Sequence, residues 1–226
     1  MENTYSIVGL DDTQVGNANT SIDNINGDLV NLIFIAIDGS GSMLGYSKDM
    51  VQSLDNFKNA ILSSKDVDDI LIARADFSSA MTIGGYKKVA DLDTAYNATG
   101  STVMYDTIIE GKTRLFDYMN YLKNQGVRTK AVFAVFSDGS DNGSRNDAAK
   151  AKNAVDEMNS KEITTAFISF GPGATSEATR LGFKNSLNVS SSASELRRAF
   201  DVLSKSVISS SRSVVSSANS NFFDVI

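Results

Sequence analysis

One stretch of the sequence decides the fold: LVNLIFIAIDGSGS, residues 29–42. Residues 29–37 are almost continuously apolar and rich in β-branched side chains, which predicts a strand buried within a sheet. At the end of this strand a carboxylate and two hydroxyls alternate with glycines, at Asp38, Ser40 and Ser42. Hard oxygen donors of this kind suit Mg²⁺ or Mn²⁺. The stretch therefore predicts a buried strand that leads into part of a metal site.

The composition indicates a globular chain with an acidic balance. Of its 226 residues, 42% are hydrophobic and 21% are charged, which fits one α/β domain with extensions or at most two small domains. The net charge is −6, and no cluster of Lys and Arg supplies the basic patch that a nucleic-acid partner requires. We expect no membrane span and no signal peptide, because the apolar runs are short and no basic residue precedes one at the N-terminus. Together with the lack of cysteine, this predicts a cytoplasmic protein.

The sequence contains no histidine, and this absence narrows the possible chemistry most. Without His or Cys, the chain has no Ser-His-Asp or Cys-His catalytic group and no His/Cys zinc site. Any metal must therefore be held by oxygen, and any enzyme would depend on Asp, Glu, Lys, Tyr or metal-bound water.

Strands and helices are predicted to alternate along the chain. Apolar runs indicate strands at 29–37, 69–77, 81–89, 131–136, 163–170 and 187–189, and helical spacing indicates helices at 50–61, 104–124, 147–160, 177–181 and 192–207. The third strand contains Gly84 and Gly85, so we expect it to be bulged and hairpin-paired. The alternation favours an α/β fold with a mostly parallel sheet covered by helices on both faces.

Two of the predicted strands end in Asp-Gly, at Asp38 and Asp138. Ligands of open α/β sheets bind at the carboxyl ends of the strands, where the strand order reverses. If these two strands are neighbours there, both carboxylates face one crevice. Between them in sequence lies the hydroxyl-rich loop 99–102, whose Thr102 would bring a third hydroxyl to the same crevice.

These three pieces, in this order, resemble the von Willebrand factor A (vWA) domain and its metal-ion-dependent adhesion site (MIDAS). Residues 38–42 match the first motif, residues 100–106 (GSTVMYD) resemble the second, and residues 136–143 (FSDGSDNG) resemble the third. The resemblance covers residues 29–208 and implies a doubly wound, mostly parallel six-stranded sheet with one short antiparallel edge strand. It also implies a Mg²⁺ or Mn²⁺ ion at the top of that sheet. The implied ligands are Asp38, Ser40, Ser42, Thr102 and Asp138.

The predicted function is metal-dependent protein binding rather than catalysis. Because three of the five ligands are neutral hydroxyls, the metal keeps much of its positive charge and attracts a carboxylate from a partner. Asp106 is expected to support a loop by hydrogen bonding, and Asp141 is expected to be a solvated loop residue. The resemblance is to bacterial or phage intracellular, tellurium-resistance-like members of the family. For these it implies an AAA+ ATPase or a stress-response protein as partner.

Two further functions stay open at this point. The chain divides into an acidic extension at 1–28, the domain at 29–208, and a Ser-rich tail with an apolar end at 209–226. A structural subunit could dock on an assembly through those two extensions, and a Mg²⁺-dependent phosphotransfer enzyme could use Asp38. The acidic extension also suggests self-association, in which Asp11, Asp12 or Asp23 occupies the metal site of the same or a neighbouring chain.

Overall fold

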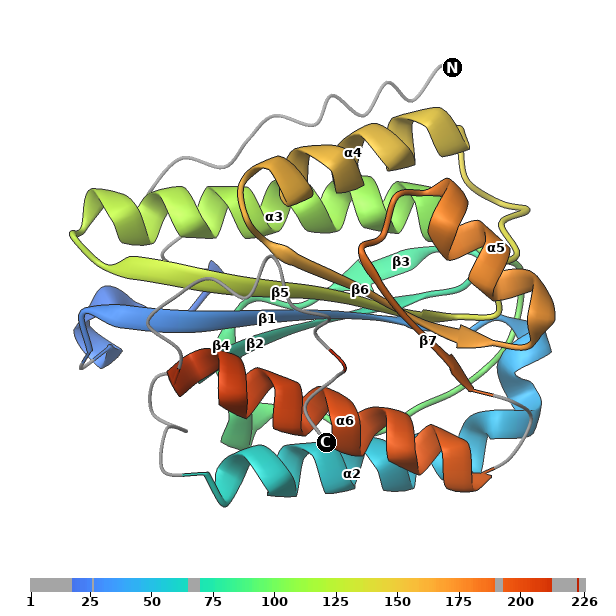
Figure 1. Ribbon diagram of the computed structural model, residues 1–226, viewed down its shortest axis with the longest axis horizontal. Helices are drawn as coiled ribbons and strands as arrows, with labels where there is room; N and C mark the ends of the chain where they lie inside the picture. Colours follow the sequence, from blue (N-terminus) through green and yellow to red (C-terminus); the bar gives the residue numbers. More distant parts are fainter. Residues whose placement is uncertain (1–17, 26, 65–69, 190–192, 213–222, 224–226) are drawn as a thin grey trace.

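A twisted sheet forms the centre of the molecule, and helices cover both of its faces (Figure 1). The computed structural model describes residues 18–25, 27–64, 70–189, 193–212 and 223. Across them the strand order is β3-β2-β1-β5-β6-β7, with β4 also pairing with β2. The strands are β1 (Leu29–Asp38), β2 (Ile70–Phe77), β3 (Met81–Ile83), β4 (Lys87–Lys88), β5 (Arg128–Ser137), β6 (Thr164–Phe170) and β7 (Asn185–Val189). Only β3 and β4 run antiparallel to their neighbour within this described part.

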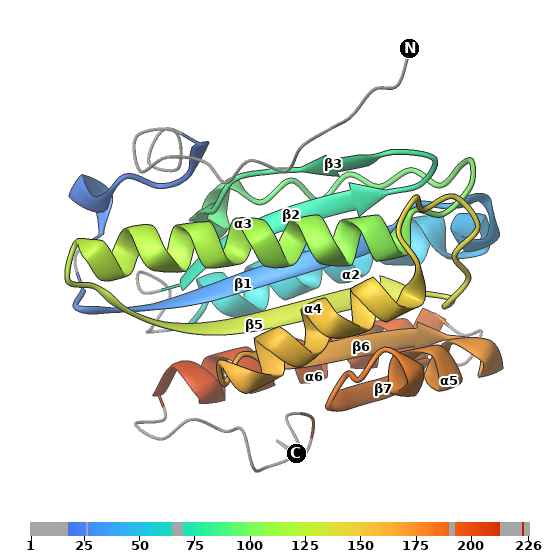
Figure 2. The ribbon, with the colours of Figure 1, turned by 90° about the horizontal axis from the view of Figure 1, so that it is seen from above.

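The helices form two layers. Helices α2 (Ser47–Leu62) and α6 (Ala193–Arg212) cover one face, and α3 (Met104–Asn124), α4 (Ala148–Ser160) and α5 (Pro172–Arg180) cover the other. Figure 2 looks onto the second face and shows α3 and α4 above the sheet. The expected doubly wound α/β fold with a mostly parallel sheet is therefore confirmed.

The position of β1 in the middle of the sheet explains why its sequence is almost continuously apolar. Alternate residues, including Leu32 and Phe34, enter the core beneath α3 and α4. The residues between them, including Ile33 and Ile35, enter the core beneath α2 and α6. A strand in the middle of a doubly covered sheet has no solvent-facing side, so the polar alternation of a surface strand is absent.

The antiparallel edge differs from the expected single strand, because β3 and β4 are separate and the described sheet has seven strands. Between them the backbone of Tyr86 bonds to another segment: its N–H donates to Asn19 Oδ1 and its carbonyl accepts from Thr20 N–H, both at 2.7 Å. A Cβ at Gly85 would lie 1.7 Å from the carbonyl oxygen of Ala18, so only glycine permits this approach. The chain ahead of β1 thus interrupts the edge strand.

Helix α5 begins five residues earlier than the predicted 177, at Pro172. Gly171, with φ of 85°, makes the turn into the helix, and proline at the first helical position has no amide hydrogen to leave unbonded. Gly-Pro-Gly at 171–173 therefore begins the helix rather than simply ending the preceding strand. In the described part of the chain, no helix has the length and apolar character needed to cross a bilayer.

Candidate metal centre

The strand order reverses at β1, which lies between β2 and β5. The two strands that end in Asp-Gly are therefore neighbours, as the site requires. Their parallel register pairs Ile37 with Phe136. Asp38 therefore lies at the level of Ser137 on the neighbouring strand, and Asp138 follows directly after Ser137. The carboxyl ends of the strands at such a reversal are where open α/β sheets bind ligands.

Asp38 is fully buried at the end of β1. Its Oδ1 accepts a hydrogen bond from Ser40 N–H at 2.8 Å, and its Oδ2 accepts one from Ser137 Oγ at 2.6 Å. Burial raises the pKa of the Asp38 carboxyl above its usual range, although the bonds from Ser137 and Ser40 act in the opposite direction. The negative charge of Asp138 adds to the rise, and so places that second carboxylate within electrostatic reach. A cation between the two would relieve both penalties.

The two serines that follow Asp38 lie together. Ser40 Oγ and Ser42 Oγ are 3.0 Å apart, with Ser40 buried and Ser42 exposed. Gly39 permits this path, because a Cβ there would lie 2.8 Å from the carbonyl oxygen of Asn97. The first loop is therefore folded directly against the chain that leads to Thr102.

Thr102 is buried in the second loop, and backbone hydrogen bonds join this loop to both others. Thr99 N–H donates to the carbonyl of Gly39 at 2.7 Å, and Thr102 N–H donates to Asn142 Oδ1 at 2.9 Å. The Thr102 carbonyl accepts from the amides of Asn142 and Gly143. Among the described residues, no hydrogen bond uses the Thr102 hydroxyl, which leaves this oxygen available to a metal.

Asp138 is half-buried in the third loop, and its Oδ1 accepts from Ser140 N–H at 3.1 Å. The next residue, Gly139, has φ of 85°, and a Cβ there would lie 2.6 Å from the Cα of Ala174 in α5. Only glycine fits this turn, so the packing of α5 helps to set the direction of Asp138.

Asp141 is not a solvated loop residue, and the prediction for it was wrong. Its Oδ2 accepts from Tyr105 N–H at 2.9 Å and from Ser144 Oγ at 2.7 Å. Val103, at the N-cap of α3, has no side chain that can accept a hydrogen bond, so Asp141 from a distant loop satisfies the helix end instead. In the sequence, the one signal for such a partner is the apolar residue Val103 at the start of helix α3, where a capping side chain is usual.

Asp106 supports a loop as expected, but not its own. Its carboxylate accepts from the backbone amides of Arg145 and Asn146 at 2.9 and 3.0 Å, and from the Asn146 side chain at 2.7 Å. It therefore ties α3 to the loop of Asp138. Asp141 and Asp106 together fix the second and third loops to the same helix end.

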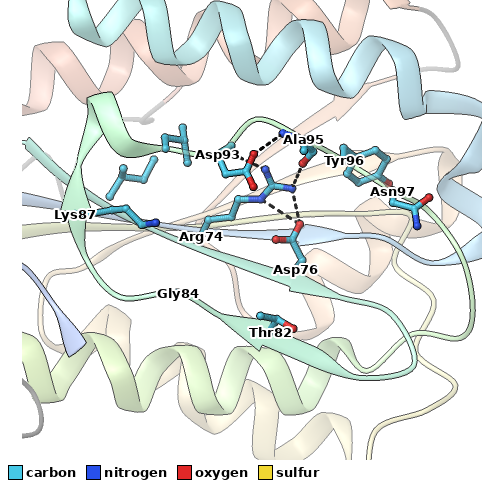
Figure 3. A pocket seen from close by; sticks show the side chains of 11 residues that line it. Arg74, Asp76, Thr82, Gly84, Lys87, Asp93, Ala95, Tyr96 and Asn97 are labelled. Carbon is cyan, nitrogen blue, oxygen red and sulfur yellow. Dashed lines mark hydrogen bonds and ion pairs between the residues drawn. The ribbon is translucent and has the colours of Figure 1, made fainter. Parts of the chain in front are cut away.

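Arg74 and Tyr96 also hold the site, and no sequence spacing indicated them. Arg74 donates to the carbonyls of Asp93 and Ala95, both at 2.6 Å, and pairs with Asp76 at 2.6 Å (Figure 3). The four residues that make these contacts line a cavity of about 410 Å³ beside β2. Tyr96 Oη donates to the carbonyl of Asp38 at 2.6 Å, and burial raises the pKa of its hydroxyl. The segment before Thr102 is thus anchored to β2 at one end and to β1 at the other.

The donor set fits a hard divalent cation. It offers two carboxylates and three hydroxyls, of which Asp38, Ser40 and Thr102 are buried, whereas Ser42 is exposed and Asp138 half-buried. Residues 18–25, 27–64, 70–189, 193–212 and 223 contain no group of three or more carboxylates that could share a metal, so the hydroxyls are essential to this set. All-oxygen coordination suits Mg²⁺ and Mn²⁺. The exposed side at Ser42 leaves room for a ligand from outside.

Of the three acidic residues predicted to occupy the metal site, only Asp23 belongs to the described part of the chain. Asp11 and Asp12 lie outside the described residues. Asp23 lies in the short 3₁₀ helix Ile22–Asn24, and Figures 1 and 2 place this blue segment at the opposite end of β1 from the loop that follows it. The ten residues of β1 separate the two by about 30 Å, so Asp23 does not occupy the site of its own chain.

Solved structures show which fold this is, whereas no family model and no curated protein matches the sequence. The pilus adhesin SpaC from Lactobacillus rhamnosus GG aligns over 81% of this chain and 30% of its own length, with a TM-score of 0.61 and 12% identity. The SpRpn10 VWA domain aligns over 77% of this chain and 95% of its own, with a TM-score of 0.55 and 12% identity. Proximal thread matrix protein 1 from the mussel byssus, with a zinc-occupied MIDAS motif, aligns over 80% of this chain and 46% of its own, with a TM-score of 0.53 and 16% identity.

These likenesses establish the fold of vWA domains for this chain. The chain spans less than a third of the adhesin's length, so the structural similarity concerns only one part of the adhesin. Whether Asp38, Ser40, Ser42, Thr102 and Asp138 bind a metal stays a prediction.

Proposed function

We propose that this protein is a metal-dependent protein-binding module. Asp38, Ser40, Ser42, Thr102 and Asp138 would hold one Mg²⁺ or Mn²⁺ ion, and the ion would supply an open position for an Asp or Glu carboxylate of a partner. The chain's own residues position these oxygens, keep water from the buried ones, and leave the side at Ser42 accessible. We propose no catalytic role for any of them.

The observation that carries the proposal is the meeting of all three loops at the reversal of strand order. Gly41 N–H donates to the carbonyl of Gly100 at 3.0 Å, which joins the first loop to the second. Asn142 joins the third loop to Thr102. Asp38 is fully buried at this junction, and a cation bound there would offset the cost of its charge. The zinc in the MIDAS motif of the mussel protein supports a metal at the same place in this fold.

Phosphotransfer from Asp38 has less support than metal binding. The carboxylate is fully buried and both of its oxygens already accept hydrogen bonds from the protein. A nucleophile must reach an incoming phosphoryl group in line, and Asp38 would have to break those contacts to do so. The partner is therefore proposed to be a protein with an exposed acidic side chain, an AAA+ ATPase or a stress-response protein among the candidates, and the site of action the cytoplasm.

The metal can be tested by thermal denaturation. Mg²⁺ or Mn²⁺ should raise the melting temperature, since a ligand that binds only the folded state stabilises it by about 2.7 kcal/mol at a hundred times its dissociation constant. In the Asp138→Ala variant this rise should disappear, because half of the carboxylate charge of the site is lost.

Asp156→Ala is a suitable control, because Asp156 is an exposed residue of α4 and its ion pair with Lys152 lies within one helix. That variant should keep the whole metal-induced rise. A rise that survives in Asp138→Ala would show that the metal binds elsewhere and would contradict the proposal.

A further inference from the structure

We propose that Leu44 forms an apolar contact beside the candidate metal centre, so that the preferred partner presents an Asp or Glu flanked by an apolar side chain. This inference rests on the proposed function and specifies the class of partner. A metal alone selects for a carboxylate, whereas Leu44 would select among the many acidic segments of other proteins.

Leu44 is the most exposed large hydrophobic side chain in the described part of the chain. Its exposed fraction is 63%, compared with 37% for Leu62 and 36% for Met81. Single exposed apolar residues are common on protein surfaces and need no explanation by themselves. The place of Leu44 sets it apart, since it follows the proposed ligand Ser42 by two residues.

The 3₁₀ helix Gly41–Tyr46 directs Leu44 to the side of the metal loops. Residues three apart lie on the same face of a 3₁₀ helix, so Leu44 stands one turn, about 6 Å, beyond Gly41. Gly41 contacts the second loop, because a Cβ built on it would lie 3.4 Å from the carbonyl oxygen of Gly100. This spacing places Leu44 on the same face of the 3₁₀ helix as Gly41, the residue that approaches Gly100 of the second loop.

The backbone around Leu44 is held in place, and there is room beside it. Met43 is fully buried in the core beneath α2, and the Leu44 carbonyl accepts a hydrogen bond from Ser47 Oγ at 2.9 Å. Beside Leu44, a Cβ built on Gly45 would meet no atom within 4 Å other than those of the adjoining residues of the same helix. A fixed backbone lowers the entropic cost of binding, and the space at Gly45 admits a partner's side chain against Leu44.

The contact can be tested with short peptides displayed densely on beads, so that weak binding is strengthened by avidity. The three peptides are acetyl-Gly-Leu-Glu-Leu-Gly, acetyl-Gly-Ala-Glu-Ala-Gly and acetyl-Gly-Leu-Gln-Leu-Gly, each in Mg²⁺ and in EDTA. In Mg²⁺, wild-type protein should bind the Leu-Glu-Leu peptide about ten-fold more tightly than the Ala-Glu-Ala peptide, because apolar side chains are buried against Leu44. The Gln peptide and EDTA should give background capture.

Leu44→Ser should bind the two Glu peptides equally and keep the metal-induced rise in melting temperature. Leu62→Ser is the matched control, since Leu62 is also exposed but lies at the far end of α2, and it should keep the ten-fold preference. Equal binding of the two Glu peptides by wild-type protein would overturn the inference and leave the metal site standing. Glu peptides that bind no better than the Gln peptide would overturn the proposed function itself.

Discussion

At the residue scale, the pair Asp38 and Ser137 decides whether a carboxylate can stay charged at the end of β1. Asp38 is fully buried, and burial penalises its charged form. Ser137 is also buried, and its Oγ both donates to Asp38 Oδ2 and accepts from Gly139 N–H at 3.0 Å. One hydroxyl therefore orients the proposed metal ligand and supports the turn that carries Asp138.

Ser137→Ala should weaken metal binding, because the substitution removes a donor from a buried carboxylate. Loss of such a supporting group usually lowers metal affinity by about 10- to 100-fold. Titration calorimetry with Mn²⁺ would measure the change. Ser169→Ala is the control: Ser169 is also buried, pairs with Ser137 in the sheet register, and its hydroxyl has no hydrogen-bond partner among the described residues. Equal affinity in the two variants would show that Ser137 does not orient Asp38.

At the scale of the element, α3 is the part on which the site is assembled. Its first turn receives Asp141, and Asp106 in the same turn holds the backbone of the third loop. The helix must lie close to the sheet to do this. Gly111 allows the approach, since a Cβ there would lie 2.7 Å from Phe34 Cζ and 3.0 Å from Phe133 Cε2. Those two rings stack at 4.7 Å between centroids and are fully buried, so neither can easily move.

Gly111→Ala should therefore destabilise the protein, although alanine favours helices by about 1 kcal/mol over glycine. Forcing a methyl group into a packed core costs about 1–3 kcal/mol, which exceeds that gain. Urea denaturation would measure the difference in the free energy of unfolding. Gly173→Ala in the first turn of α5 is the control, because no atom lies within 4 Å of a Cβ built there. A stabilised Gly111→Ala variant would mean that α3 is not held against the two rings.

At the scale of the whole molecule, two described segments outside the central α/β layers pack against the body of the domain: residues 18–20 and Phe223. Asn19 and Thr20 bond to the backbone of Tyr86, and Tyr118 Oη of α3 donates to the carbonyl of Thr20 at 2.8 Å. Phe223 is buried in the core between the sheet and the helices α2 and α6. This part of the apolar end packs on its own chain, which weakens the case for a structural subunit docked through its tail. The neighbouring Phe222, Val225 and Ile226 lie outside the described residues.

Phe223→Ala should lower the free energy of unfolding by about 3 kcal/mol, as expected for removing a buried aromatic ring. Denaturation at several protein concentrations would measure this loss, which should not depend on concentration. Leu62→Ala, at an exposed position, serves as a control and should have a small effect. Unchanged stability together with a change in oligomeric state would show instead that the tail docks on another subunit.

The sequence alone determined the order of strands and helices and the loops that could hold a metal, because apolar periodicity and Asp-Gly turns act over a few neighbouring residues. It predicted α3 to its observed ends and β1 to within one residue. Only the tertiary structure decided which loops meet and which residues support them. Arg74, Tyr96, Ser137 and Asp141 act on partners far away in the chain. Such contacts depend on sheet register and helix packing, which no local pattern encodes, and the same holds for the interrupted edge at Tyr86 and the burial of Phe223.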